Sequence, residues 1–332
     1  MNNKLARLIC DYQESTRTAL VLMQRSGIRM PFSSSDWIET EIPVHGELEG
    51  GIHYFKHGSG CAVKLPTGEV DFDFGKDGEI GGFDEWRLTR FAKNKLEEYG
   101  FETEDSLKKH FTEAVIKGSL IRSEDFLYYV ANTPRSIAMD VDSRLPGDNL
   151  PCRHLDPILV LHSGYFLAAD LMRENYEKLN KKWEKNDYLS DGDKIKFRIY
   201  LSSWLGFLRT TCEGLQKLRI RILIQENRPA RFRELIPKVD ALGQMMKQHS
   251  DPLRKFRNDT FHLRDNIEAT RNFFAKGEER LQWAEDLHFA IDKLFSEYRI
   301  LCEVHYLING RTSEISIRKK THISPKNQQT LT

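Results

Sequence analysis

The stretch LRKFRNDTFHLRDN, Leu253–Asn266, contains an arginine, an asparagine and a histidine at a spacing that could form a catalytic site. These residues are Arg257, Asn258 and His262. If this stretch is helical, Asn258 and His262 share one face, because residues four apart are neighbours on a helix. Arg257 precedes His262 by five positions, about 140° around the axis and ~7.5 Å along it. One helix alone holds the arginine and the histidine apart. Two copies crossing near a two-fold axis would bring both pairs into one cleft.

Such a cleft would suit cleavage of RNA. A neutral imidazole can take the proton from a ribose 2′-hydroxyl, or give one to the leaving oxygen. A guanidinium is permanently charged and planar, so Arg257 would stabilise the phosphate and its transition state. Asn258 would orient the imidazole or the phosphate. This chemistry needs neither a metal ion nor a cofactor, and we expect none at these residues.

The same residues resemble a known family. The segment FRNDTFH matches the Arg-polar-x-x-x-His signature of HEPN domains, and Tyr200–Leu218, YLSSWLGFLRTTCEGLQKL, resembles their Trp-containing upstream helix. The resemblance covers about residues 155–310, half of the chain. HEPN proteins are commonly metal-independent endoribonucleases that act as dimers in toxin–antitoxin, abortive-infection and phage-defence systems. The resemblance implies that Arg257 and His262 are the catalytic pair, supported by Asn258.

The front half of the chain contains a second group of polar residues. His53, His57, Cys61, Asp71 and Asp73 raise the question of a metal site, but nothing in their spacing fixes four ligands. We favour paired strands with polar edges. The surrounding segment Gly51–Leu88, with its HGSGC, VDFDFG and FDEWRL motifs, resembles an uncharacterised bacterial domain found near toxin and immunity genes. That resemblance implies no catalytic residues.

Charge is distributed unevenly along the sequence. Asp36–Glu85 holds 12 acidic and 3 basic residues, a net charge of −9, whereas Leu208–Lys238 is at +5 and Arg311–Thr332 at +4. Basic residues near the HEPN-like motif could contact RNA phosphates, although a solvated helix face is the competing interpretation. The RNA-binding candidates are Arg219, Arg221, Arg228, Arg231, Arg233 and Lys255.

Apolar periodicity predicts how these residues are positioned. Residues 1–131 combine helical stripes with strand alternation around a turn at Pro66–Gly68, which predicts a small α+β domain with an antiparallel sheet. Residues 132–156 contain three prolines and predict a linker. Residues 157–310 predict an all-α, HEPN-like helical bundle, and 311–332 a basic tail. The helices predicted in the bundle are 157–185, 193–225, 230–249, 251–275 and 278–308.

Composition excludes several classes of protein. No apolar run approaches the roughly 20 residues of a membrane-spanning helix, so we expect no membrane partner. The N-terminus lacks the apolar core of a signal peptide, and the five cysteines form no CxxC pair. These features favour a cytoplasmic protein with reduced thiols.

Two hypotheses from different classes follow. The first is a metal-independent endoribonuclease of bacterial toxin–antitoxin or anti-phage systems, acting on RNA as a homodimer, with the N-terminal domain as its regulator. An antitoxin or a phage-derived trigger protein would be a further partner. The second is a non-catalytic binding or immunity module, in which the HEPN-like dimer binds nucleic acid, a nucleotide or a protein.

Overall fold

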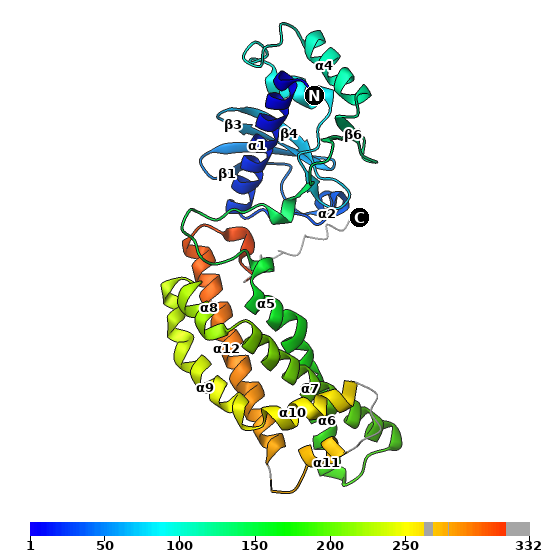
Figure 1. Ribbon diagram of the computed structural model, residues 1–332, viewed down its shortest axis with the longest axis vertical. Helices are drawn as coiled ribbons and strands as arrows, with labels where there is room; N and C mark the ends of the chain where they lie inside the picture. Colours follow the sequence, from blue (N-terminus) through cyan, green and yellow to red (C-terminus); the bar gives the residue numbers. More distant parts are fainter. Residues whose placement is uncertain (262–267, 278, 317–332) are drawn as a thin grey trace, which may run out of the picture. The chain divides into compact units, whose positions relative to one another are not determined.

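The structure is a computed structural model that describes residues 1–261, 268–277 and 279–316 (Figure 1). These residues form two compact units. The N-terminal unit comprises Met1–Leu145 with the described residues from Tyr306 onward, and the helical unit comprises Pro146–His305. The prediction of a small antiparallel α+β domain followed by an all-helical region is confirmed.

A four-stranded antiparallel sheet organises the N-terminal unit, and its strands follow one another in chain order. The turn predicted at Pro66–Gly68 is present, and Leu65 pairs with Gly68 across it. Gly68 has a φ of +139°, a backbone conformation that residues with a Cβ rarely adopt. The strands are β1 (His45–Leu48), β2 (Ile52–His57), β3 (Gly60–Leu65) and β4 (Gly68–Asp73).

Helix α1 (Asn3–Arg25) packs against one face of this sheet and forms the core of the unit with it. Side chains alternate between the two faces of a strand, so every second residue of β3 and β4 meets the helix. The residues buried there are Cys61, Val63, Val70 and Phe72. Tyr12 of α1 is also fully buried, and its hydroxyl donates a 2.6 Å hydrogen bond to the carbonyl of Asp71.

Shorter elements complete the unit. Helix α3 (Glu85–Ala92) contacts β4, and Asp84 caps its N-terminus by accepting a hydrogen bond from the Arg87 amide. Two further strand pairs flank the sheet. The remaining elements are α2 (Ser34–Glu39), α4 (Glu104–Ile116), β5 (Glu79–Ile80), β6 (Leu120–Arg122), β7 (Tyr128–Val130) and β8 (Ser136–Ile137).

The segment expected to be a linker contains regular structure. Strand β8 lies within residues 132–156 and pairs with β5, so its backbone hydrogen bonds are made inside the N-terminal unit. The division between the units falls after Leu145. The segment expected to be a basic tail begins with a short 3₁₀ turn, Thr312–Glu314, and Arg311 is buried beside Glu314. Its later residues, 317–332, lie outside the described chain.

Among the described residues of the helical unit, every regular element is a helix. The prediction of one helix over 193–225 is wrong at its end, because Arg219 has a φ of +46° and separates two helices there. A π-helical turn at His162–Phe166 interrupts the first predicted helix. The α-helices are α5 (Pro157–Leu161), α6 (Leu167–Asn186), α7 (Asp191–Lys217), α8 (Ile220–Glu226), α9 (Ile236–Gln248), α10 (Ser250–Phe261), α11 (Glu268–Phe273) and α12 (Arg280–Ile308).

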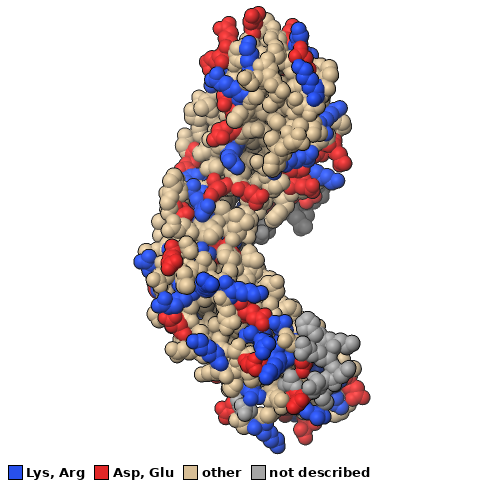
Figure 2. Space-filling view, viewed as in Figure 1, with Lys and Arg blue, Asp and Glu red and all other residues tan. Residues whose placement is uncertain are grey.

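Opposite charges are mixed in the folded N-terminal unit. Figure 2 shows basic and acidic side chains interspersed over its visible face. Four arginines outside the acidic segment 36–85 form ion pairs with its carboxylates. These arginines are Arg25, Arg87, Arg90 and Arg135. Among the residues that the structure describes, no helix is long and apolar enough to cross a membrane.

Candidate functional site

Helix α10 positions the HEPN-like residues by packing against α7. Leu253 and Phe256 are buried on its inner side, and the Phe256 ring lies 5.1 Å from that of Phe273. At the start of α10, the Ser250 hydroxyl accepts a 3.0 Å hydrogen bond from Arg209 of α7. The apolar contacts and this hydrogen bond fix how far α10 is turned about its axis, and therefore where Arg257 points.

Arg257 is held by a carboxylate of α7. Its Nη2 atom donates to both oxygens of Glu213, at 2.7 and 2.8 Å. Arg209 contacts the same carboxylate, with its Nε 3.2 Å from Glu213. The Nε atom of Arg257 is buried and makes no hydrogen bond within the described chain. The guanidinium is therefore oriented while part of its donor capacity remains unused.

The C-terminal end of α10 lies directly against α7. Phe261 contacts Gly206 so closely that a Cβ added to the glycine would lie 1.9 Å from the phenylalanine ring. Phe261 is nevertheless 50% exposed. The next residue is His262, which lies outside the described residues, and Asn258 is half-buried on α10. The structure thus describes the positions of Arg257 and Asn258, two of the three predicted site residues. That His262 lies close to them stays a prediction.

The predicted RNA-binding residues separate into two kinds. Five of them are exposed: Arg219, Arg221, Arg231, Arg233 and Lys255. Three of these five have acidic neighbours, Arg221 with Asp240, Arg231 with Glu234, and Lys255 with Asp251. Exposed ion pairs of this kind are weak, so these side chains remain available to a phosphate.

Arg228 requires a correction. Its side chain is buried, with its Nε donating to the Tyr298 hydroxyl at 2.6 Å and its Nη2 to Asp156 at 3.2 Å. The Tyr298 hydroxyl donates to the same carboxylate at 2.6 Å, and burial raises the pKa of this tyrosine. Asp156 also caps α5. Because its donors are used inside the protein, Arg228 stabilises the helical unit, and the prediction that it contacts RNA is wrong.

A second polar cluster lies in the N-terminal unit, around Arg87 of α3. The Arg87 guanidinium donates to Asp73 at 2.6 Å and to Asp84, and its Nε lies 3.4 Å from Asp71. His57 of β2 lies 3.3 Å from Asp71 and 4.0 Å from Asp73. This cluster unites residues from each of the three motifs of the segment Gly51–Leu88.

The strand register explains the cluster. His57 pairs with Gly60, which in turn pairs with Asp73, so the glycine lies between the two side chains. A Cβ at Gly60 would lie 2.2 Å from an oxygen of Asp73. Asp71 and Asp73, two residues apart on β4, share one face. Burial raises the pKa of Asp73, although Arg87 and His57 oppose this shift.

The residues that raised the question of a metal site are divided between two faces of the sheet. Cys61 belongs to the face buried against α1, and burial raises the pKa of its thiol to about 12. A search of the described residues found no group of three or more His, Cys, Asp or Glu side chains that could hold a metal ion. The histidine and the aspartates instead surround an arginine that the metal hypothesis did not include.

The geometry thus defines a protein with an α+β unit built around a charged cluster and a helical unit with an oriented arginine. A family profile described as "Domain of unknown function (DUF6896)" matches residues 5–130, within the N-terminal unit. This stretch includes the whole of the Arg87 cluster. No curated protein matched the chain. No solved structure matched it either.

Proposed function

We propose that this protein is a metal-independent, HEPN-type endoribonuclease of a bacterial toxin–antitoxin or anti-phage system. One observation supports this function above all: Glu213 orients Arg257 of α10 through its Nη2 atom, and the arginine side chain remains 23% exposed. An arginine held in this way can receive a phosphate without losing its orientation. The five free cysteines agree with a cytoplasmic location.

In the proposed reaction, His262 removes the proton from a ribose 2′-hydroxyl. The resulting oxygen attacks the adjacent phosphorus, the bond to the 5′-oxygen breaks, and that oxygen takes up a proton. The products are a 2′,3′-cyclic phosphate and a 5′-hydroxyl. Arg257 stabilises the charge that develops on the phosphate oxygens. A homodimer would supply a second Arg257 and His262 to the same cleft.

The N-terminal unit would regulate this reaction. A cover formed only by attraction between the acidic segment and the basic RNA site is a weak mechanism, because arginines of the N-terminal unit already pair with many of those carboxylates. Regulation through a bound ligand, an antitoxin or a phage-derived trigger protein fits the charge distribution better.

Cleavage of RNA in the presence of EDTA tests the proposed activity. The wild-type protein should cut RNA and leave 2′,3′-cyclic phosphate ends. His262→Ala should lower the rate by about 10²- to 10⁴-fold, the usual contribution of a general acid or base. Arg257→Ala should also abolish most activity. Arg254→Ala is the matched control, because Arg254 is an exposed arginine on the same helix and pairs only locally with Asp251.

The alternative is a non-catalytic binding or immunity module. It is favoured by the same ion pair, since the Glu213 carboxylate competes with phosphate for Arg257. No cleavage by the wild type, and no growth defect on expression that His262→Ala relieves, would support this alternative. A protein that cleaves RNA as a monomer would contradict the composite site.

A further inference from the structure

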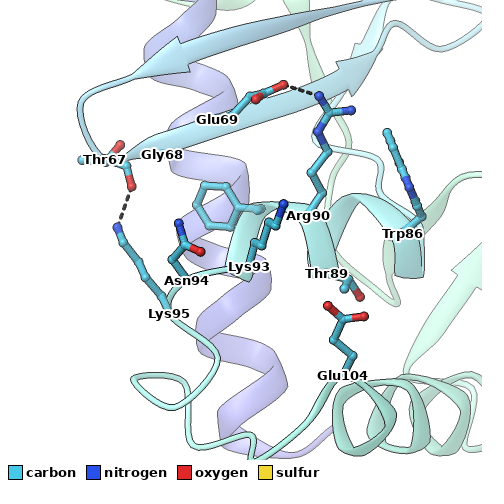
Figure 3. A pocket seen from close by; sticks show the side chains of 11 residues that line it. Thr67, Gly68, Glu69, Trp86, Thr89, Arg90, Lys93, Asn94, Lys95 and Glu104 are labelled. Atoms are coloured by element: carbon cyan, nitrogen blue, oxygen red, sulfur yellow. Dashed lines mark hydrogen bonds and ion pairs between the residues drawn. The ribbon is translucent and has the colours of Figure 1, made fainter.

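A pocket of about 620 Å³ opens in the N-terminal unit between the β3–β4 turn, α3 and the start of α4 (Figure 3). Thr67 and Gly68 line it from the turn, Trp86 and Lys93 from α3 and the residue after it, and Glu104 from α4. Pockets that hold small ligands commonly measure ~300–1,000 Å³. The proposed RNA-cleavage site uses none of these residues, so the pocket has no assigned role.

The pocket wall presents several cations, and most of its residues follow the acidic segment 36–85 in the sequence. Lys95 donates to the carbonyl of Thr67 at 2.5 Å, a contact that leaves its positive charge uncompensated. Lys93 is exposed, and neither lysine forms an ion pair with a carboxylate of the described residues. Arg90, the third cation of the wall, pairs with Glu69. Glu104 is the one wall carboxylate for which the described residues show no ion pair, so the two unpaired lysines leave the wall net positive and would attract an anion.

The same wall holds an aromatic ring in a fixed position. Trp86 is 55% exposed, and its ring centroid lies 5.0 Å from the Arg90 guanidinium and 5.9 Å from that of Arg87. Because aspartates fix Arg87 and Glu69 fixes Arg90, these cation–π contacts restrict the indole before any ligand arrives. A restricted and exposed indole suits stacking with another planar ring.

We propose that this pocket binds a nucleoside 5′-phosphate, with the base stacked on Trp86 and the phosphate bound by Lys93 and Lys95. Figure 3 shows these side chains distributed along the wall that α3 and the following residues form. The ligand has two sources with the same chemistry, a free nucleotide or the 5′-phosphorylated end of an RNA. This inference does not depend on the proposed nuclease activity.

Calorimetric titration of the full-length protein tests this site with four probes. They are adenosine 5′-monophosphate, adenosine, inorganic phosphate, and a 5′-phosphorylated 2′-O-methyl oligonucleotide that attack by a 2′-hydroxyl cannot cleave. We expect the monophosphate to bind at least about 10-fold more tightly than adenosine or phosphate, since it uses both halves of the site. Tighter binding of the oligonucleotide would identify an RNA end as the ligand. Tighter binding of the monophosphate would identify a free nucleotide.

Variants locate the binding. Trp86→Ala should weaken it about 10-fold and Trp86→Phe much less, because a phenyl ring still stacks. Lys93→Ala should weaken binding and reduce its salt dependence. Lys76→Ala is the matched control, an exposed lysine of the same unit outside the pocket wall.

Three results would overturn the proposal. One is the absence of saturable binding by either nucleotide probe. Another is equal affinity for phosphate and the monophosphate. The third is equal weakening by Lys93→Ala and Lys76→Ala. If Trp86→Ala fails to fold, Trp86→Phe and Lys93→Ala still decide the matter. Because no probe is cleaved, failure here is distinguishable from failure of the nuclease assay.

Discussion

Arg87 in the N-terminal unit and Arg257 in the helical unit are both held by carboxylates, but in different numbers. Arg87 is surrounded by three aspartates and is 12% exposed. Arg257 shares a single carboxylate, Glu213, with a second arginine and is 23% exposed. Arg87 thus contacts three carboxylates, of which Asp71 also lies within 3.5 Å of His57 and Arg90, whereas Arg257 contacts one carboxylate.

This difference indicates what each arginine does. Loss of Arg87 would leave Asp84 without an ion pair and Asp73 with only His57, while Asp71 would keep His57 and Arg90. Removing one partner of a buried ion pair is the costly way to break it. Around Glu213, loss of one arginine leaves the carboxylate paired with the other. We therefore expect Arg87 to matter more for the stability of its unit than Arg257 does for that of the helical unit, which agrees with the proposed role of Arg257 as a phosphate ligand. Arg228, whose donors are used by Asp156 and Tyr298, resembles Arg87.

The largest effect expected from this comparison is on stability. Arg87→Ala should destabilise the N-terminal unit by somewhat less than the ~3–5 kcal/mol that breaking a fully buried pair costs, because Asp84 and Asp73 lose their guanidinium while Asp71 keeps Arg90. Arg257→Ala should change the free energy of unfolding by less than about 1 kcal/mol. Denaturant unfolding measures both changes, and hydrogen exchange of the β4 amides assigns the first to its unit.

Arg87→Lys serves as the control, because it keeps the charge but cannot reach three carboxylates in the geometry of a guanidinium. It should fall between the wild type and the alanine variant. If Arg257→Ala proved as destabilising as Arg87→Ala, the distinction between a structural and an available arginine would fail.

The sequence predicted local features of the fold well and long-range ones poorly. The Pro66–Gly68 turn and most of the helices follow from the residues inside each element. Strand β8 was missed because its two residues are ordered by pairing with β5, more than fifty residues earlier. The left-handed Arg219 was missed because nothing in its own residue type favours that conformation.

The same difference separates the two candidate sites. The spacing of Arg257, Asn258 and His262 is visible in six consecutive residues, so the local pattern was enough to propose them as a site. Arg87 entered the second cluster through the register of three strands, which no local pattern reports. Glu213 was missed as the partner of Arg257 because it lies 44 residues away. The motif FDEWRL was the one available signal for Arg87.

A second difference between the units concerns pH. In the helical unit, His288 is buried, donates from Nε2 to Asp170 at 3.0 Å, and accepts at Nδ1 from the Trp204 indole at 3.2 Å. These partners require the neutral ring, and burial lowers the pKa of His288 although Asp170 opposes the shift. Burial lowers the pKa of His162 as well. In the N-terminal unit, burial raises the pKa of Asp73.

These opposite shifts predict opposite responses to acid. A histidine whose pKa is lowered in the folded protein stabilises the fold fully above pH 6.5, its ordinary pKa. This stabilisation is lost as the pH falls through the lowered pKa. Asp73, whose pKa is raised in the folded protein, stabilises the fold fully below pH 3.8, its ordinary pKa. This stabilisation is lost as the pH rises through the raised pKa. Acidification below 6.5 should therefore destabilise the helical unit relative to the N-terminal unit.

Hydrogen exchange at neutral and mildly acidic pH, corrected for intrinsic rates, measures this response separately in each unit. The amides of α6 and α12 should lose protection on acidification more than those of β3 and β4. His288→Gln should reduce the difference, since glutamine does not titrate and His162 alone remains. Equal loss of protection in the two units, or no effect of His288→Gln, would contradict the assignment.

The smallest effect concerns where RNA binds. Arg231 is 65% exposed and has only a 4.0 Å contact with Glu234, so Arg231→Ala should leave stability unchanged. If it contacts a phosphate, the substitution should weaken binding of RNA a few-fold and lower the salt slope of the affinity by about 1. The measurement needs a His262→Ala background, in which RNA remains intact. Arg122, an exposed arginine of the N-terminal unit beside Phe126, gives the matched control. Equal losses from Arg231→Ala and Arg122→Ala would mean that RNA is attracted by both units, and that the basic segment 208–238 does not define the site.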